Sequence, residues 1–281
     1  MKAFGFNTMI VLLIFSSMGV LNAQNKVCLE NTEQFSIASK YVIGEKYVIQ
    51  TGLPIGYSST HKSYPVLYVL DGDKSFGMTK EISDWLMWSN EIKNIIVVGI
   101  SYGQGMDAWW NKRARDYTPG SDTIFGKDFL NAGGADNFIK FIKNELFPVI
   151  NITYRTIPDS SAISGLSFGG LLSSYILFTQ PEMFKGYIII SPALVWNNKS
   201  ILKLENEYFS NHKELNKAVY IAYGSLDDKD WVINPTNEFM NIIKMHNYQG
   251  LTFVPKIFEG ETHISVFSTA LTNGLKTIFL P

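Results

Sequence analysis

A glycine-rich segment, SGLSFGG at 164–170, contains the residue types that acyl-transfer chemistry requires. Its residues Gly165, Ser167 and Gly169 match the pattern G-x-S-x-G, which places a serine on a sharp turn between a strand and a helix. The apolar run AIS leads into the segment and the run GLLSSYILF leads out of it, so a strand and a helix are expected on its two sides. The alternative is a plain small-residue connection, but with these flanks we predict that Ser167 is a nucleophile.

A serine hydroxyl is a weak nucleophile and needs a base, and for this pattern the order along the chain is serine, acid, histidine. The histidines downstream are His212, His246 and His263. His212 stands in a polar segment, and His246 ends an expected helix, where a capping role explains it. His263 lies in FEGETHISVF, between the last expected strand and the last helix, and is predicted to be the base.

The acid of such a set orients the imidazole and stabilises its charged form. It should follow the strand before the histidine, and the run VYIAYG at 219–224 is followed by Asp227. We predict Asp227 as this acid. The alternatives are Asp228, Asp230, Glu259 and Glu261.

Acyl transfer also needs hydrogen-bond donors for the developing oxyanion. The backbone N–H of Phe168, the residue after the serine, is one by position. The second is expected from the loop Asp71-Gly72-Asp73 after the run VLYVL, where Gly72 permits a sharp turn. We predict the backbone N–H of Asp73 for this role.

Tryptophans are candidates for substrate contacts because their rings combine a large apolar surface with one polar group. Trp109, Trp110 and Trp196 are predicted to line an aromatic pocket, with packing in the core as the alternative. Arg113 is predicted to meet an anionic substrate, together with Arg115. The alternative for both arginines is an ion pair, with Asp116 or Asp128 as the acid.

The elements that must position these residues alternate between short apolar runs and longer segments with helical spacing. Such alternation predicts crossover units and an α/β fold, with a mostly parallel, twisted sheet of about eight strands and helices on both faces. Two β-rich stretches between residues 33 and 54 predict an antiparallel hairpin at the N-terminal end. Residues 24–281 are expected to form a single domain, with 102–132 as an irregular insertion above the sheet. Helices are expected at 75–90, 133–147, 169–180, 198–216, 232–247 and 263–279.

The first 23 residues resemble a signal peptide, with Lys2, the apolar run 9–21 and a small residue, Ala23, before the expected cut. A retained anchor is the alternative, but a membrane span needs about 18 or more apolar residues. We predict an exported protein, periplasmic or secreted, without stable membrane insertion after cleavage.

Composition excludes several classes of function. The formal net charge is −1 and becomes −2 when Lys2 is removed with the signal peptide, so no basic field for nucleic acid is expected. Cys28 is the single cysteine, which excludes an intramolecular disulfide. The histidines lack paired spacing and no phosphate-binding loop is present, so neither a metal nor a cofactor is predicted.

Five segments of the chain together form a recognisable pattern: YPVLYVLDGD (64–73), RARDYTP (113–119), SGLSFGG (164–170), PEMFKGYIIISPALVW (181–196) and EGETHISV (259–266). With these segments the sequence resembles the esterase family of α/β-hydrolases that includes S-formylglutathione hydrolases, mycolyltransferases, feruloyl esterases and siderophore esterases. The resemblance runs from about Phe35 to the C-terminus and is closest to the siderophore-esterase branch. It implies the α/β-hydrolase fold, the set Ser167, Asp227 and His263, and the donors Asp73 and Phe168. In the siderophore branch a serine–histidine pair can suffice.

These residues predict a serine carboxylic-ester hydrolase that forms an acyl-enzyme and needs no cofactor. The expected partner is a small-molecule or carbohydrate ester, with siderophore, feruloyl and acetylated-carbohydrate esters as the candidates. Two alternatives remain open: an acyltransferase of the same fold, and a relative that binds its ligand without turnover. The sequence does not determine the oligomeric state.

Overall fold

The structure is a computed structural model that describes residues 28–103, 105–122, 129 and 131–281. The predicted signal peptide, residues 1–23, lies outside the described residues. Within the described part of the chain, no helix is both long enough and apolar enough to cross a membrane.

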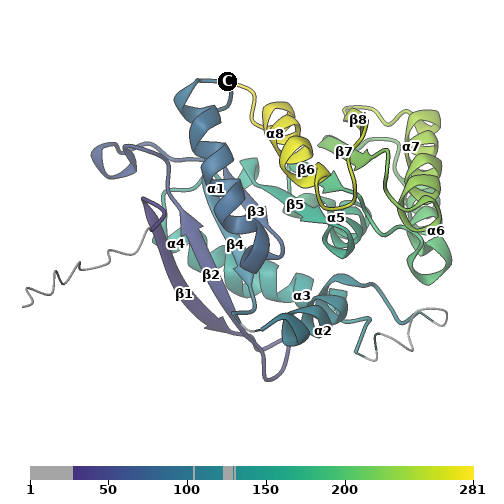
Figure 1. The fold of residues 1–281 in the computed structure, drawn as a ribbon, viewed down its shortest axis with the longest axis horizontal. Coiled ribbons are helices and arrows are strands. Elements are labelled where there is room, and N and C mark those ends of the chain that lie inside the picture. The colour runs from purple at the N-terminus through teal and green to yellow at the C-terminus, as the bar shows by residue number, and fades with distance from the viewer. Residues whose placement is uncertain (1–27, 104, 123–128, 130) are drawn as a thin grey trace, which may run out of the picture.

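One mixed sheet forms the centre of the molecule (Figure 1). In the described residues it has the order β1-β2-β4-β3-β5-β6-β7-β8. Its first pairings, β1 with β2 and β2 with β4, are antiparallel, and all later pairings are parallel. The predicted hairpin and mostly parallel sheet are therefore confirmed. The strands are β1 (Thr32–Ala38), β2 (Lys46–Gly52), β3 (Val66–Val69), β4 (Ile96–Ser101), β5 (Ala162–Leu166), β6 (Gly186–Ile190), β7 (Ala218–Gly224) and β8 (Thr252–Phe258).

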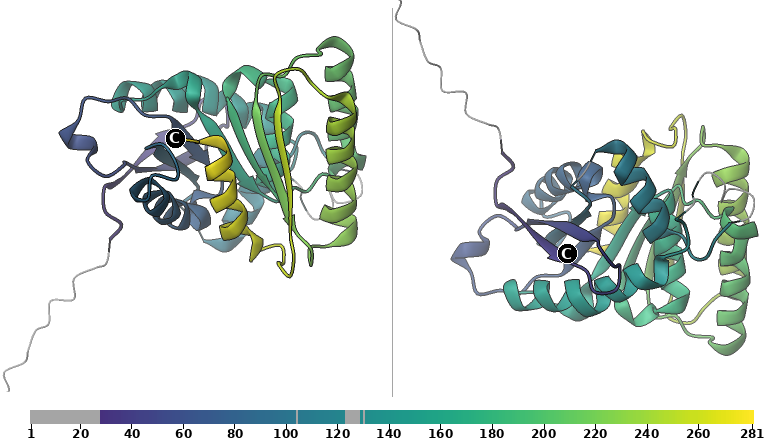
Figure 2. Two further views of the ribbon diagram at one scale, coloured as in Figure 1. Left: turned by 90° about the horizontal axis from the view of Figure 1, so that it is seen from above. Right: turned by 90° about the horizontal axis from the view of Figure 1, so that it is seen from below.

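The central strands read as continuous apolar runs because helices cover them on both sides. All residues of β3, β4 and β6 are buried. Two clusters of buried side chains lie on opposite faces of the sheet, and Figure 2 shows the two helical layers. One layer consists of α1 (Gly72–Trp88) and α8 (Val266–Ile278). The other contains α3 (Ala135–Phe141), α4 (Phe147–Thr153), α5 (Phe168–Thr179), α6 (Trp196–Asn211) and α7 (Asn234–His246).

The stretch 102–132, which we expected to be irregular, contains the helix α2 (Met106–Tyr117). Hydrophobic periodicity does not mark this helix because its buried positions include Arg113 and Asp116 as well as Ala114 and Tyr117. Each of these charged side chains forms an ion pair, as buried charges require. Arg113 pairs with Asp71, which directly precedes α1, and Asp116 pairs with Arg115 of α2 itself. The prediction of an irregular insertion is therefore wrong for residues 106–117.

Other element boundaries differ from the expected ones by a few residues. The helix expected at 133–147 continues as a π-helical turn, η2 (Ile142–Leu146), and then as α4 to Thr153. A second π-helical turn, η5 (Lys229–Ile233), precedes α7. Such turns insert one residue into the helical repeat and rotate the side chains that follow.

Candidate active site

Ser167 lies on the turn that joins β5 to α5, at the carboxyl edge of the sheet. Its φ of 62° and ψ of −117° are strained values for a residue with a side chain. Gly165 and Gly169 meet across the turn, and a Cβ on Gly165 would lie 2.3 Å from the carbonyl carbon of Gly169. Gly165 is thus required by the close approach of two backbone segments.

The turn is also tied to the end of the neighbouring strand β6. The N–H of Ser167 donates to the carbonyl of Ile190 at 3.0 Å, and the carbonyl of Ser167 accepts from the N–H of Ala193 at 3.1 Å. These two bonds fix the backbone of the serine from both sides, so the strained conformation is held by the surrounding structure.

His263 lies in the loop between β8 and α8, and its Nδ1 is 2.7 Å from Oδ1 of Asp227. Asp227 follows β7, and its side chain is fully buried. Its Oδ2 accepts from the hydroxyl of Ser191 at 2.6 Å and from the N–H of Gly224 at 3.2 Å. The predicted acid and base, which are 36 residues apart in the sequence, thus form a direct hydrogen bond.

The Asp227 carboxylate is stabilised in its ionised form. Burial raises its pKa, but the hydrogen bonds from His263, Ser191 and the Gly224 N–H outweigh burial and hold the pKa below its ordinary value. A carboxylate that is ionised and bound to Nδ1 fixes the tautomer of the imidazole and leaves Nε2 for a reacting group.

Two of the alternative acids, Asp228 and Glu261, have other partners. Asp228 caps the turn η5, where its Oδ1 accepts from the N–H groups of Asp230 at 2.9 Å and Trp231 at 2.8 Å. The Glu261 carboxylate accepts from the hydroxyl of Ser265. Of the candidate carboxylates, Asp227 is the one that the structure places on His263.

A cavity of about 400 Å³ has both Ser167 and His263 in its wall. The predicted contacts Trp109, Trp110 and Arg113 also line it, from α2. The remaining wall includes Met78 of α1, Ile264 of the loop before α8, and Phe267 of α8. The structure therefore brings the predicted nucleophile, the predicted base and three of the predicted substrate contacts to one cavity.

Trp196 does not line this cavity. It is fully buried at the start of α6, and its indole N–H donates to the carbonyl of Gly120 at 3.3 Å. Its ring centre lies 5.3 Å from that of Phe168, so it packs against the residue that follows Ser167. The structure thus gives Trp196 the core position that was the alternative for the tryptophans.

Arg113 forms a two-point ion pair with Asp71, with Nε–Oδ1 and Nη2–Oδ2 distances of 2.9 Å. Its side chain is 3% exposed, and its guanidinium lies 4.9 Å from the ring centre of Trp109 and 5.1 Å from that of Trp110. The alternative to an anionic substrate was an ion pair of these arginines with Asp116 or Asp128. Asp116 pairs with Arg115 and not with Arg113, and Asp128 lies outside the described residues.

The predicted oxyanion donors both occupy first turns of helices. Phe168 is the first residue of α5 and Asp73 the second of α1, positions where the helix itself supplies no acceptor for the backbone N–H. Asp71, with a φ of 55°, makes the turn that we expected at Gly72. Gly72 is needed instead for close packing, since a Cβ there would lie 2.4 Å from Oγ of Ser101.

The side chain of Asp73 also has a structural role. Its carboxylate accepts from the N–H of Tyr102 at 2.7 Å and from the N–H of Gly103 at 2.8 Å. These bonds tie the first turn of α1 to the end of β4, which fixes the loop that presents the Asp73 N–H.

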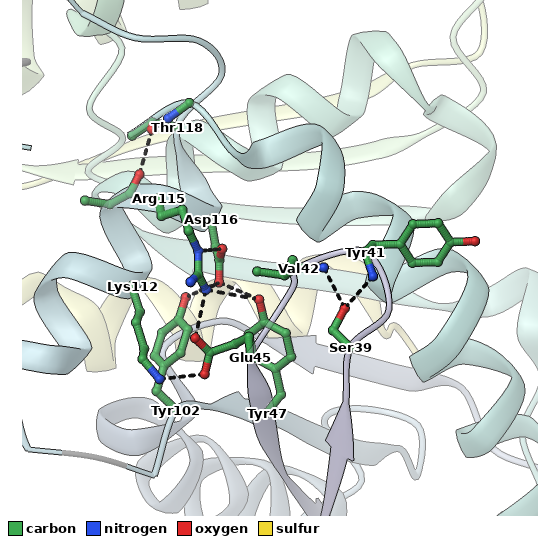
Figure 3. A network of polar contacts seen from close by, with 12 residues as sticks. Ser39, Tyr41, Val42, Glu45, Tyr47, Tyr102, Lys112, Arg115, Asp116 and Thr118 are labelled. Atoms are coloured by element: carbon green, nitrogen blue, oxygen red, sulfur yellow. Dashed lines mark hydrogen bonds and ion pairs between the residues drawn. The ribbon is translucent and has the colours of Figure 1, made fainter. Parts of the chain in front are cut away.

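A buried polar network holds α2 against β2 and the end of β4 (Figure 3). Asp116 is fully buried and accepts from the hydroxyls of Tyr47 at 2.7 Å and Tyr102 at 3.1 Å. Arg115 binds both Asp116 and Glu45, and Glu45 also accepts from Lys112. Because α2 carries Trp109, Trp110 and Arg113, this network sets the position of one wall of the cavity.

Sequence reasoning missed two residues of the site, Asp71 and Ser191. Asp71 stood in the loop from which only Gly72 and Asp73 were considered. Ser191 follows the apolar strand YIII, and a polar residue at the carboxyl end of a parallel strand is a signal for a site residue. Among the described residues, no group of three or more histidine, cysteine, aspartate or glutamate side chains is arranged to hold a metal ion.

Comparison with known proteins places these observations in a family. The family described as "Putative esterase" matches residues 40–277. The chain is 30% identical to the ferri-bacillibactin esterase BesA of Bacillus subtilis over 231 residues, which are 78% of this chain and 80% of the relative. It is 27% identical to the siderophore triacetylfusarinine C esterase of Aspergillus fumigatus over 90% of this chain and 94% of the relative.

A solved structure, the BES protein from Bacillus cereus, superimposes with a TM-score of 0.82 at 30% identity. The superposition covers 98% of this chain and 100% of that protein. The family match spans most of the chain, including all the site residues described above. The chain therefore belongs to this esterase family and has the α/β-hydrolase fold.

Proposed function

We propose that this protein is a serine carboxylic-ester hydrolase that acts through an acyl-enzyme. The observation that supports this proposal is that Ser167 and His263 line one cavity, while His263 is bonded to a buried, ionised Asp227. The naming of its relatives as esterases agrees with this chemistry.

In the proposed reaction, Oγ of Ser167 attacks the ester carbonyl carbon while Nε2 of His263 takes the hydroxyl proton. The oxyanion accepts hydrogen bonds from the N–H groups of Phe168 and Asp73. The imidazolium, stabilised by Asp227, then gives its proton to the leaving alkoxide, and the acyl group remains on Ser167. Water, deprotonated by His263, attacks the acyl carbon and releases the acid and the free serine.

For the substrate we propose a siderophore ester, in keeping with the siderophore esterases among its relatives, with feruloyl and acetylated-carbohydrate esters as the other candidates. The cavity suits a ligand with aromatic or other apolar groups, because Met78, Trp110 and Ile264 line it and are exposed at its rim. Such side chains gain free energy when a ligand covers them.

The charge of the cavity bears on the substrate as well. Arg113 is neutralised by Asp71, which leaves Lys74 as the cationic lining residue without an ion pair among the described residues. A substrate with little net charge therefore fits the described wall better than a polyanion does.

Ser167→Ala tests the mechanism. We expect ester turnover to fall on the order of 10⁶-fold with the fold intact. A fluorophosphonate should label the wild type at Ser167 and leave the variant unlabelled. Unchanged turnover by the variant would refute the mechanism, and a parallel assay of p-nitrophenyl acetate, a feruloyl ester, an acetylated sugar and a trilactone siderophore identifies the substrate class.

We also propose that the protein is exported, with cleavage after Ala23. The proposal rests on the charged start, the apolar run and the small residue at the cut. Expression of the full chain followed by N-terminal sequencing of the mature protein tests it, and Gln24 is the expected first residue. A mature protein that starts at Met1 would contradict export by this route.

A further inference from the structure

The carboxylate of Asp227 is held from the side opposite His263 by Ser191. The hydroxyl of Ser191 donates to Oδ2 at 2.6 Å, while Oδ1 accepts from His263 at 2.7 Å. Both contacts are short, and a hydrogen bond to an ionised acceptor is about twice as strong as one between neutral groups. The two oxygens of one carboxylate are thus fixed by two different side chains.

The backbone of Ser191 is set for this contact. The residue follows the last residue of β6, is fully buried, and has a φ of 39°, which is uncommon for a residue other than glycine. Its N–H donates to the carbonyl of Ala222 in β7 at 2.7 Å. The strand end is therefore bound to β7, the strand after which Asp227 lies.

The same short segment, residues 190–193, also holds the nucleophile. Ile190 accepts from the N–H of Ser167, and Ala193 donates to the carbonyl of Ser167. A Cβ on Gly170 would lie 2.9 Å from Cβ of Pro192, so the start of α5 is packed closely on this segment. This one segment thus holds Ser167 through Ile190 and Ala193 and the carboxylate of Asp227 through Ser191.

We propose that Ser191 is a positioning residue of the hydrolytic reaction, which keeps the Asp227 carboxylate in the orientation that His263 needs and joins it to the strand end that holds Ser167. This inference rests on the proposed function. Ser191 acts through Asp227 and is assigned no contact with the substrate.

Without the Ser191 hydroxyl, Oδ2 of Asp227 keeps the N–H of Gly224 at 3.2 Å as its remaining donor among the described residues. The carboxylate then has more freedom to rotate about its Cβ–Cγ bond, and one hydrogen-bond donor fewer stabilises its negative charge. The titratable neighbours that bear on it are His263 and Tyr223, and the hydroxyl of Tyr223 donates to Asn237. Neither group can replace the lost donor on Oδ2.

Ser191→Ala removes the hydroxyl and leaves the methylene group. We expect kcat to fall about tenfold, with KM nearly unchanged. A tenfold change corresponds to the loss of about one hydrogen bond to a charged group. We also expect the acid limb of the pH profile of kcat/KM to move to higher pH. A carboxylate that has lost one hydrogen-bond donor attracts the protonated imidazole more strongly. A purely structural role would leave that limb in place.

Two further variants test whether the effect comes from the lost Ser191 hydroxyl. One controls for the strained backbone at this position, and the other controls for the loss of a buried hydroxyl elsewhere. Ser191→Gly also lacks the hydroxyl but tolerates the positive φ, so it should show the same pH shift. Ser83→Ala removes another buried hydroxyl, on α1, which has no hydrogen-bond partner among the described residues, and should keep the wild-type profile.

The outcomes distinguish this inference from the proposed function. If Ser167→Ala is inactive and Ser191→Ala keeps both the wild-type kcat and the wild-type acid limb, the role of Ser191 is overturned while the hydrolase stands. If Ser167→Ala retains activity, the proposed function fails first. If Ser191→Ala does not fold, the same comparison is made with Ser191→Gly.

Discussion

Arg113 and Asp71 form an ion pair through two parallel hydrogen bonds in the wall of the cavity, at the start of the loop that presents the Asp73 N–H. The pair joins α2 to the turn before α1, and Nη2 of Arg113 also donates to the carbonyl of Leu166, directly before Ser167. One arginine thus bonds the chain two residues before each of the proposed oxyanion donors, Asp73 and Phe168. Its charge serves the architecture of the site and is not free for a ligand.

Asp71→Asn should destabilise the fold because it leaves the Arg113 guanidinium buried without its counter-charge. Removal of one partner of a buried pair costs about 3–5 kcal/mol. Chemical denaturation monitored by fluorescence measures the free energy of unfolding. The double variant Asp71→Asn, Arg113→Met should recover most of the loss, and a single variant with a cost below about 1 kcal/mol would show that the pair behaves as a surface contact.

Asp227→Asn should lower kcat by about 10⁴-fold, because an amide neither stabilises the imidazolium nor selects the required tautomer. Steady-state kinetics on p-nitrophenyl acetate measure the effect. Asp228→Asn is the matched control, one residue away, and should keep kcat, since the Asp228 side chain caps η5. A small effect of Asp227→Asn would mean that a serine–histidine pair suffices in this protein.

Asp227 should also make stability depend on pH. Its pKa in the folded protein lies below the ordinary value, which is about 4 in an unfolded chain. Its stabilising contribution is therefore complete above about pH 4 and decreases as the pH falls through the folded pKa. The difference in free energy of unfolding between wild type and Asp227→Asn should shrink as the pH falls below about 4, and a constant difference would contradict the depressed pKa.

Gly165→Ala should disrupt the turn that holds Ser167, because its new Cβ would lie 2.3 Å from the carbonyl carbon of Gly169. Overpacking of this kind costs about 1–3 kcal/mol, and here it also displaces Ser167. We expect a lower Tm together with a large loss of activity. Gly105→Ala is the control, since a Cβ there meets nothing within 4 Å, and it should keep both properties.

The sequence by itself was sufficient for features that depend on local patterns. The continuous apolar runs predicted the buried parallel strands, and the small residues around Ser167 predicted the turn that the structure shows. The serine, acid, histidine order singled out His263 and a group of acids after β7. Such features depend on neighbours within a few residues, so a pattern in the chain records them.

Only the tertiary structure decided between chemically equal candidates. Asp227 and Asp228 are adjacent and identical in type, yet one is bonded to His263 and the other caps a turn. α2 escaped prediction because partners distant in sequence, such as Asp71, stabilise its buried charges. Ser191 acquires its role because β6 and β7 lie side by side. Each of these depends on contacts between residues far apart in the chain, where folding determines which charges and donors meet.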